Sequence, residues 1–414
     1  MTGVQPVARH AHLCEFRDAN GDALDRGLLL YFPGPSSYTG EDVVELHGHG
    51  GTVVSDLLLA GALARGARAA EPGEFSLRAF VNDKLDLTQA EGIADLISSG
   101  SEKAAKAAFR SLEGRFSAHV NELQVKLTSL RVELEACLDF PDEELELDDT
   151  SKFETDFDDT IADLEILLGQ AREGAVLSNG IVVVIAGPPN AGKSSLLNRL
   201  SGYDAAIVTD IPGTTRDALR ENLSLDGLPI TIVDTAGLRR SSDPVEIEGM
   251  RRAQRALEGA DRLVWVTDIR DNLTATIAEV RDIAGDDAEV TVIQNKVDLV
   301  AEEPGRIEND GITVIRLSAL TGEGVELLTE HLKALAGYRG DSAGTFSART
   351  RHVDALKRAE HYIRDAKLQV VRTLALELAA EELRQAQSAL SEITGEITSD
   401  DLLGEIFSSF CIGK

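Results

Sequence analysis

A glycine-rich segment near the middle of the chain has the residue types and spacing that bind nucleotide phosphates. Residues 187–194 read Gly-Pro-Pro-Asn-Ala-Gly-Lys-Ser and lie between the apolar stretch Ile181–Ala186 and a helix expected over Ser195–Leu200. Backbone N–H groups of such a loop surround the β-phosphate, and the helix N-terminus adds partial positive charge. Lys193 is expected to reach the β- and γ-phosphates, and Ser194 to ligate Mg²⁺. This segment alone does not distinguish ATP from GTP.

Two segments farther along the chain favour guanine over adenine. Asn295-Lys296-Val297-Asp298 follows a strand-like stretch, and the Asp298 carboxylate can accept hydrogen bonds from N1–H and N2–H₂ of guanine. Adenine lacks that pair of donors, so a buried Asp298 would select GTP. Ser318-Ala319 follows another strand-like stretch and suits a backbone contact to guanine O6. With the phosphate loop, these segments predict a GTP site.

The remaining motifs belong to the magnesium side of that site. Asp234-Thr-Ala-Gly237 ends a strand-like stretch, which places a carboxylate near Mg²⁺ and a glycine N–H near the γ-phosphate. The loop Gly213–Asp217 can place a threonine hydroxyl on the metal, so Ser194 and Thr215 are the expected Mg²⁺ ligands. The full set of expected nucleotide contacts is Asn190, Ala191, Gly192, Lys193, Ser194, Ser195, Thr209, Asp210, Ile211, Pro212, Gly213, Thr214, Thr215, Asp234, Thr235, Ala236, Gly237, Asn295, Lys296, Asp298, Ser318, Ala319 and Leu320.

Hydrolysis requires a feature that the motifs do not supply. Ras-type GTPases place a glutamine directly after Asp-x-x-Gly to orient the attacking water. This chain has Leu238 there, which cannot orient water. Arg239 could bring positive charge to the transition state, or it could be a solvated loop arginine. The means of activation stays open at this level.

The pattern of apolar residues predicts a multidomain protein with an α/β unit inserted into a helical one. Strands and helices alternate between residues 180 and 336, which predicts a parallel sheet with helices on both faces. The strand-like stretches are Ile181–Ala186, Pro229–Val233, Arg262–Thr267, Val290–Gln294 and Ile312–Leu317.

The flanks of that unit are helical, and a small α+β unit precedes them. An apolar stripe runs along Leu112, Phe116, Val120, Leu123, Leu127, Leu130 and Leu134, and helical patterns return after residue 347. We expect an N-terminal domain over residues 1–83, a helical domain over 84–176 and 340–414, and a GTPase domain over 177–339. The two helical flanks should then pack as one bundle.

Composition limits the partners and the compartment. The 414 residues carry a net charge of −30, which disfavours non-specific nucleic-acid binding outside local basic patches. The three cysteines are far apart and indicate no disulfide framework. No signal peptide and no apolar run of membrane-spanning length are visible, so a cytoplasmic protein is expected.

Segments along nearly the whole chain resemble the MnmE/TrmE family of tRNA-modification GTPases. They are Phe32-Pro-Gly-Pro-Ser-Ser-Tyr-Thr-Gly-Glu-Asp42, Gly48-His-Gly-Gly51, Pro72-Gly-Glu-Phe75, Asn82-Asp-Lys-Leu-Asp-Leu87, Phe140-Pro-Asp-Glu-Glu144 and Phe410-Cys-Ile-Gly-Lys414. The resemblance implies that the chain acts with a flavin-dependent MnmG (GidA) protein. The pair would add an aminomethyl-type group to C5 of the wobble uridine of certain tRNAs. A tetrahydrofolate, in 5-formyl or methylene form, would supply the one-carbon unit.

The resemblance also implies roles for particular residues. The N-terminal domain would form a homodimer and bind the folate, with contacts from Glu45, Lys84 and Lys414. K⁺, held by Asn190, Thr209, Ile211 and Thr214, would replace an arginine finger when two G domains meet. Glu246 would help to position the attacking water, so Glu246, Asn190 and Lys193 are the expected catalytic residues. Cys411 would lie near the modification centre, or it is a small buried hydrophobe.

The chain departs from the family at its start. Members begin with a further strand and a glycine-rich turn, roughly forty residues before the position of Met1, and that segment carries an arginine of the folate site. A truncated N-terminal domain is therefore expected.

Two other classes of function remain as alternatives. A ribosome-assembly GTPase would use the switch to time rRNA binding, and such proteins append a basic module, often with a Gly-x-x-Gly loop. Gly337-Tyr-Arg-Gly340 has that pattern, but the segment after it is acidic helix such as Glu377–Glu382. The other alternative is a scaffold that binds GTP without turnover.

Overall fold

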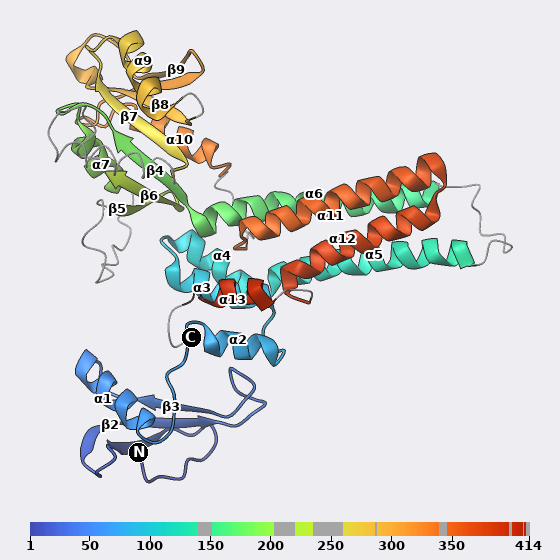
Figure 1. The fold of residues 1–414 in the computed structure, drawn as a ribbon. Coiled ribbons are helices and arrows are strands. Elements are labelled where there is room, and N and C mark those ends of the chain that lie inside the picture. Colours follow the sequence, from blue (N-terminus) through green and yellow to red (C-terminus); the bar gives the residue numbers. More distant parts are fainter. Residues whose placement is uncertain are drawn as a thin grey trace. The chain divides into compact units, whose positions relative to one another are not determined.

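A computed structural model describes residues 1–139, 151–202, 220–234, 260–285, 288–338, 346–396, 400–408 and 410. The chain forms two compact units, one of Met1–Ala94 with Gln387–Lys414 and one of Asp95–Ala386 (Figure 1).

The first unit begins with a three-stranded antiparallel sheet in the order β1-β2-β3, from β1 (His12–Arg17), β2 (Ala23–Phe32) and β3 (Val43–His47). Alternate residues of β1 are buried, because successive side chains of a strand point to opposite faces. Cys14 and Phe16 therefore lie with Leu29 in a small core that Leu46 and Leu58 also join. Leu58 comes from α1 (Thr52–Leu63), which covers this face of the sheet.

The first unit also contains α2 (Glu74–Val81), the start of α3 (Leu87–Ser98) and α13 (Asp400–Ser408). Their shared core contains Leu87, Ala90, Ile406, Phe407 and Phe410. The first and last parts of the chain thus fold together.

The second unit contains long helices from both flanks of the α/β region. Before it come α4 (Glu102–Leu112), α5 (Arg115–Asp139) and α6 (Ser151–Asn179). After it come α11 (Thr350–Leu368), the π-helical turn η2 (Gln369–Thr373) and the first part of α12 (Leu376–Thr394), up to Ala386. Helices α6 and α11 lie side by side (Figure 1), and Lys367 of α11 contacts Asp158 of α6 at 2.7 Å. The expected packing of the two flanks against each other is confirmed.

The returning chain is fixed to the last turns of α6. A Cβ at Gly174 would lie 2.2 Å from the backbone oxygen of Phe346, so only glycine allows this approach. Phe346 also stacks on Phe116 of α5 with ring centroids 4.3 Å apart, and Ser111 of α4 donates to the Ser347 carbonyl at 2.9 Å. The α/β region therefore leaves and rejoins the helices at neighbouring points.

The apolar stripe predicted across residues 112–134 is half-buried at Leu112 and buried from Phe116 onward, and it is divided between two helices. From Phe116 to Leu134 every predicted position is buried along α5. Leu112 ends α4, and Gly114, in a left-handed conformation with φ 80°, separates the two helices.

The α/β region is built on a seven-stranded sheet in the order β5-β6-β4-β7-β8-β10-β9. Its strands are β4 (Ile181–Ala186), β5 (Arg220–Leu225), β6 (Leu228–Asp234), β7 (Arg262–Asp268), β8 (Val290–Asn295), β9 (Gly305–Asn309) and β10 (Ile312–Arg316). The inner pairs are parallel, and β5 and β9 are antiparallel edge strands.

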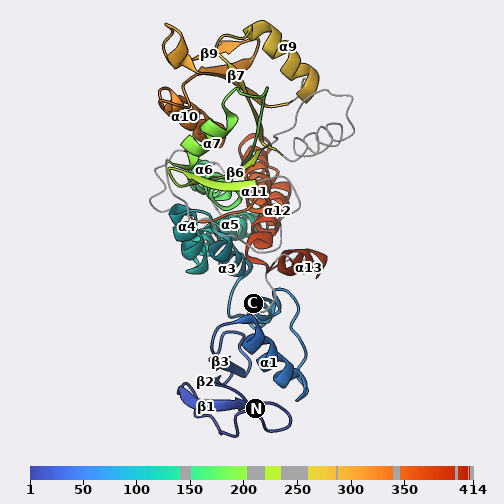
Figure 2. The same ribbon diagram turned by 90° about the vertical axis from the view of Figure 1, so that its left-hand side faces the viewer.

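Helices cover both faces of this sheet (Figure 2). Leu196 and Leu200 of α7 (Lys193–Ser201) pack on one face with Leu328 of α10 (Val325–Leu335). Ile277 and Val280 of α9 (Leu273–Ala284) pack on the other. The predicted fold class, a small α+β domain with a GTPase-type α/β domain inserted into a helical domain, is confirmed.

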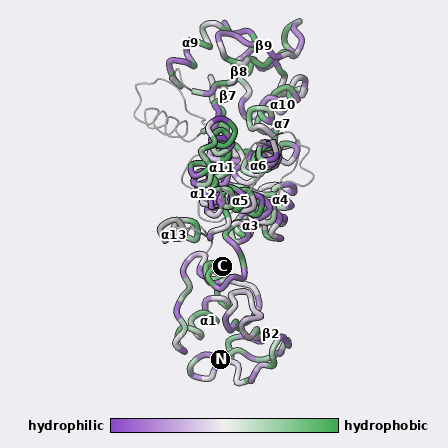
Figure 3. Tube along the Cα trace, turned by 90° about the vertical axis from the view of Figure 1, so that its right-hand side faces the viewer, coloured by the Kyte–Doolittle hydropathy of each residue, from purple (hydrophilic) through white to green (hydrophobic). Residues whose placement is uncertain are grey.

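None of the helices in the described ranges is long and apolar enough to span a membrane. Hydrophilic and hydrophobic residues are intermixed along the helical segments (Figure 3).

Candidate nucleotide site

The glycine-rich loop connects β4 to α7, as the sequence predicts. Gly187 has φ 139° and is packed so closely on β7 that a Cβ would lie 2.0 Å from the Val266 carbonyl oxygen. Gly192 precedes the first residue of α7 with φ 100°, a conformation that favours glycine. Asn190 is exposed with φ 60°, which asparagine tolerates better than most residues. The loop's shape therefore follows from these residue types.

The Lys193 side chain lies over this loop. Its Nζ donates to the carbonyl oxygens of Gly187 and Pro188, each at 2.9 Å. Ser194 and Ser195 follow in the first turn of α7, and both are exposed. An ammonium and hydroxyls thus gather at the N-terminus of a helix, where anions bind favourably.

Asn295 joins the phosphate loop to both guanine segments. It ends β8 and is 2% exposed. Its Nδ2 donates to the Ala191 carbonyl at 2.7 Å, and its Oδ1 accepts from the Ala319 N–H at 2.9 Å. A Cβ at Gly192 would lie 2.1 Å from the Asn295 Nδ2, so glycine is required for this contact. Segments that are distant in the chain thereby form one site.

Lys296 is held by the carboxylate of Asp268, a residue that was not predicted from the sequence to belong to the site. Its Nζ lies 2.9 Å from Asp268 Oδ2, at the end of the neighbouring strand β7. Arg270 donates to the same carboxylate through Nε at 2.8 Å and Nη2 at 2.7 Å. Hydrogen bonds from Arg270, and then from Lys296, hold the pKa of Asp268 far below its ordinary value. Asp268 is therefore ionised and fixes Lys296 beside the site.

Asp298 lies in the short 3₁₀ helix η1 (Val297–Leu299), directly after Lys296. It is exposed, so the assumption that this carboxylate is buried in the protein itself is wrong. In the same short helix Val297 is only 2% exposed, so the turn buries one side chain and exposes the next. Exposure keeps the carboxylate oxygens open to a ligand.

The segment after β10 forms a closed turn beside Asn295. Ser318 is fully buried, Ala319 is 3% exposed and Leu320 is 75% exposed. A cavity of about 610 Å³ lies between this turn and α7, lined by Ser195, Asn198, Arg199, Gly202, Ala319 and Leu320. Arg199 donates to backbone carbonyls of the turn, and this role was not predicted from the sequence.

Two family models together match nearly the whole chain. A family model described as the MnmE helical domain matches residues 87–411, and one described as the N-terminus of the GTP-binding protein TrmE matches residues 2–84. The chain belongs to the MnmE/TrmE family. It is thus a tRNA-modification GTPase at the level of the family, and the family's N-terminal domain is present in residues 2–84.

Several solved structures resemble this MnmE/TrmE chain in part. The G domain of the T. maritima FeoB iron transporter is 28% identical, covers 38% of this chain and 98% of its own, and has a TM-score of 0.30. Era of Aquifex aeolicus bound to GDP and AlF₄⁻ is 23% identical, with 44% and 66% coverage and a TM-score of 0.30. A GTP-binding protein of Sulfolobus solfataricus in complex with GDP is 19% identical, with 65% and 79% coverage and a TM-score of 0.30.

Several of the expected site residues of this MnmE/TrmE chain lie outside the described residues. They are Thr209, Asp210, Ile211, Pro212, Gly213, Thr214, Thr215, Thr235, Ala236, Gly237, Leu238, Arg239, Glu246, Cys411 and Lys414. Asp234 is the last residue of β6, where its backbone pairs with Ile185 of β4.

Two of the expected folate contacts are described, both in the first unit. Glu45 is exposed on β3, and its carboxylate lies 2.7 Å from His47 Nε2. Lys84 is exposed after α2, and its Cγ would lie 3.5 Å from a Cβ placed on Gly40. Lys84 therefore borders the loop between β2 and β3, residues 33–42.

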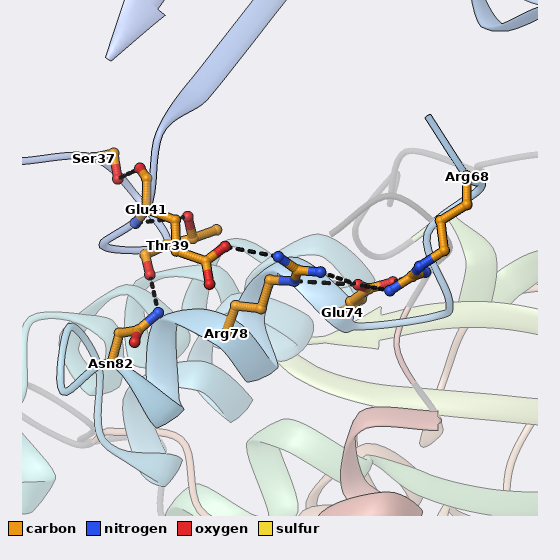
Figure 4. A network of polar contacts seen from close by, with 7 residues as sticks. All are labelled: Ser37, Thr39, Glu41, Arg68, Glu74, Arg78 and Asn82. Carbon is orange, nitrogen blue, oxygen red and sulfur yellow. Dashed lines mark hydrogen bonds and ion pairs between the residues drawn. The ribbon is translucent and has the colours of Figure 1, made fainter. Parts of the chain in front are cut away.

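A polar network ties that loop to α2 (Figure 4). Arg78 lies between two carboxylates and donates to Glu41 at 2.7 Å and to Glu74 at 2.8 Å. Arg68 donates to Glu74 from the other side at 2.8 Å, and these contacts, with that of Arg68 first, lower the pKa of Glu74 to about 2. Asn82 adds a bond to the Thr39 carbonyl at 2.8 Å. The loop beside Lys84 is thus held on both sides.

Proposed function

We propose that the site binds and hydrolyses GTP, with Mg²⁺ as the metal cofactor. The observation that carries the proposal is the double hydrogen bond of Asn295, which brings the phosphate loop and the guanine segments into one site. Lys193 would neutralise charge on the β- and γ-phosphates. Exposed Ser194, with Thr215, would hold Mg²⁺, which supplies charge neutralisation to the phosphates when bound. The other contacts would come from the residues predicted from the sequence.

Base selection tests this proposal most directly. Asp298, exposed at η1, would accept from guanine N1–H and N2–H₂. Equilibrium binding should show strong competition by GTP and GDP and weak competition by ATP. Asp298→Asn should shift preference toward xanthosine diphosphate, because an amide can donate to the C2 carbonyl of xanthine. Equal competition by ATP would contradict the guanine assignment.

We further propose that K⁺ accelerates hydrolysis when two G domains meet. Asn190 offers an exposed side-chain oxygen on the phosphate loop, and Thr209, Ile211 and Thr214 would complete an all-oxygen site. Such a donor set suits a large alkali cation, and positive charge at the transferring phosphoryl group is worth ~10³–10⁵ in rate. Glu246 would orient the attacking water, which Leu238 cannot do.

Turnover in KCl and NaCl of equal ionic strength tests the cation. KCl should be faster, and the advantage should rise with protein concentration. Asn190→Ala should lose the K⁺ stimulation, but alanine also strains a position with φ 60°. Asn190→Gly removes the oxygen without that strain, so it should lose the stimulation equally. Glu246→Ala should cut turnover and spare GTP binding, and identical rates in the two salts would refute the mechanism.

At the level of the pathway, we propose that a homodimer of this chain acts with a flavin-dependent MnmG-type protein on the wobble uridine of certain tRNAs. Folate would contact Glu45, Lys84 and Lys414, and the rigid loop beside Lys84 supports a preformed site there. The N-terminal domain would comprise residues 1–83, the helical domain residues 84–176 with 340–414, and the GTPase domain residues 177–339. The protein would act in the cytoplasm. Cys411 and Lys414 would act in modification.

Mass spectrometry of wobble nucleosides tests this role. A deletion strain should regain the modified uridine when the full chain is restored. A chain lacking residues 411–414 should fail to restore it while keeping GTP hydrolysis. Loss of both activities would assign the tail to folding instead.

A further inference from the structure

Arg199 connects the helix of the phosphate loop to the backbone of the guanine segment. It lies on α7 less than two turns after Lys193, and its Nε donates to the Ala319 carbonyl at 3.3 Å. Its Nη2 donates to the Leu320 carbonyl. The guanidinium also packs on Gly322, where a Cβ would lie 3.5 Å from Cζ and Nη1. One side chain thus holds two consecutive peptides of the turn.

The turn has a closed hydrogen-bond pattern of its own. Ser318 N–H donates to the Glu323 carbonyl at 2.8 Å, and Gly322 N–H donates to the Ser318 carbonyl at 2.8 Å. Thr321 N–H donates to Ser318 Oγ at 3.1 Å. Within this ring the carbonyls of Ala319 and Leu320 face Arg199. The guanidinium therefore completes the turn from the side of α7.

Because the peptide bond is planar, the contact of Arg199 with a carbonyl also fixes the direction of the N–H group in the same peptide. In a trans peptide the C=O and N–H point in opposite directions. The Ala319 carbonyl and the Leu320 N–H belong to one peptide, so a carbonyl that faces Arg199 makes the Leu320 N–H point away from α7. Asn295 fixes the preceding N–H, that of Ala319, at 2.9 Å. Two side chains thereby set the direction of two successive backbone donors.

We propose that Arg199 is a positioning residue for guanine recognition, which aims the Leu320 backbone N–H at the O6 of the base, while the Ala319 N–H stays bound to Asn295. The inference rests on the proposed GTP site and adds a specificity residue to it. The planar guanidinium with its fork of donors suits a pair of adjacent carbonyls, which a lysine ammonium cannot hold in the same way. Because α7 begins at Lys193, the same helix places phosphate and base contacts relative to each other.

The surroundings of Arg199 make it testable by truncation. Its side chain borders the cavity of about 610 Å³ and not the apolar core, so Arg199→Ala enlarges an existing space. The leucines of α7 that do enter the core, Leu196 and Leu200, are unaffected. The variant should therefore fold and lose only the two hydrogen bonds.

The test compares affinities of the full chain for three Mg-nucleotides: GDP, inosine diphosphate and 6-thio-GDP. Sulfur is a weak acceptor, so 6-thio-GDP probes the O6 contact, whereas inosine lacks only the N2 amine. Arg199→Ala should reduce the preference for GDP over 6-thio-GDP by about fivefold, as expected for one ordinary hydrogen bond. The preference for GDP over inosine diphosphate should not change. Arg199→Lys should show a smaller reduction in the same direction.

A matched control is Arg281→Ala on α9. Arg281 also donates from a helix to a loop carbonyl of the same sheet domain, that of Asp310, but this loop precedes β10, whereas the guanine turn follows it. It should leave both preferences unchanged.

Three results would overturn the proposal. An unchanged preference for GDP over 6-thio-GDP in Arg199→Ala would remove Arg199 from base recognition. An equal fall in all three affinities would assign it to general stability of the turn. A wild-type chain that binds guanine nucleotides without preferring GDP over 6-thio-GDP would also refute the contact of the Leu320 N–H with O6. A wild-type chain that binds none of the three would instead refute the GTP site itself. If Arg199→Ala does not fold, the Arg199→Lys comparison decides in the same way.

Discussion

Asn295→Ala is the perturbation whose size follows most directly from the geometry. The change deletes two hydrogen bonds, to the Ala191 carbonyl at 2.7 Å and from the Ala319 N–H at 2.9 Å. Each bond contributes about 1 kcal/mol net, and a buried group left unpaired costs about 1–3 kcal/mol. Ala191 and Ala319 are 2% and 3% exposed, so solvent replaces these partners poorly. We expect a loss of about 2–4 kcal/mol in the free energy of unfolding.

The single tryptophan of the chain provides the assay. Trp265 is 2% exposed on β7 in the middle of the sheet, so its fluorescence reports unfolding of the α/β domain. With a urea m-value of about 2 kcal/mol/M, the expected loss lowers the midpoint of nucleotide-free protein by about 1–2 M. GDP affinity should fall as well, because the phosphate loop and the guanine turn lose their common anchor.

Asn295→Asp is the matched control. The carboxylate keeps an acceptor for the Ala319 N–H but places an oxygen against the Ala191 carbonyl, so only the second bond is lost and repulsion is added. Its midpoint should fall too, while the Ala319 amide stays protected from hydrogen exchange. A midpoint shift below about 0.3 M for Asn295→Ala would refute the bridge as a stabilising contact.

Three further predictions concern other parts of the structure. Gly187→Ala should lower GDP affinity at least about tenfold in calorimetry, because its Cβ would lie 2.0 Å from the Val266 oxygen; Gly169→Ala, with nothing within 4 Å, should leave it unchanged. Burial lowers the pKa of His331 to about 4, so the unfolded chain takes up a proton first and stability falls as the pH drops from about 6.5 to 4. His331→Gln should therefore show a smaller difference in urea midpoint between pH 7 and 5, and an equal difference would exclude this histidine as the cause. The pKa of Glu74 is lowered to about 2, so its ion pairs stabilise the fold above about pH 4.5 and are lost as the pH falls toward 2. Glu74→Gln should speed hydrogen exchange in residues 37–42 at pH 7 and have less effect at pH 3. The same effect at both pH values would exclude the charge of Glu74 as the cause of the protection.

The sequence predicted the interior of the sheet well because buried parallel strands are continuous apolar runs. The predicted stretch Ile181–Ala186 is β4 itself, and β6, β7, β8 and β10 lie within two residues of the predictions. The edge strands β5 and β9 were missed, as was β1. Their sequences, such as Gly-Arg-Ile-Glu-Asn in β9, mix polar and apolar residues and become strands only through pairing with a neighbour.

The residues of the nucleotide site, too, could be predicted from the sequence only in part. The glycines and Lys193 could be predicted because local backbone geometry and phosphate chemistry dictate those residue types. Arg199 and Asp268 could not, because each acts on a partner far along the chain: Arg199 on a carbonyl 120 residues away, and Asp268 on Lys296. No local pattern records such a pairing. The exposure of Asp298 was missed for a related reason, since burial depends on where the strand before it ends.

The attachment of the α/β region has a consequence for how such a chain could arise. Helix α6 runs to Asn179 and β4 begins at Ile181, while the returning Phe346 lies against Gly174 of the same helix. The two ends of the inserted segment are therefore separated by little more than one helical turn of their host. Segments with neighbouring ends can be gained, lost or exchanged between genes without parting the surrounding helices. The geometry of the nucleotide-binding region is thus that of a domain that could be exchanged as a unit, and the contact of Gly174 with Phe346 lies at its boundary with the helices.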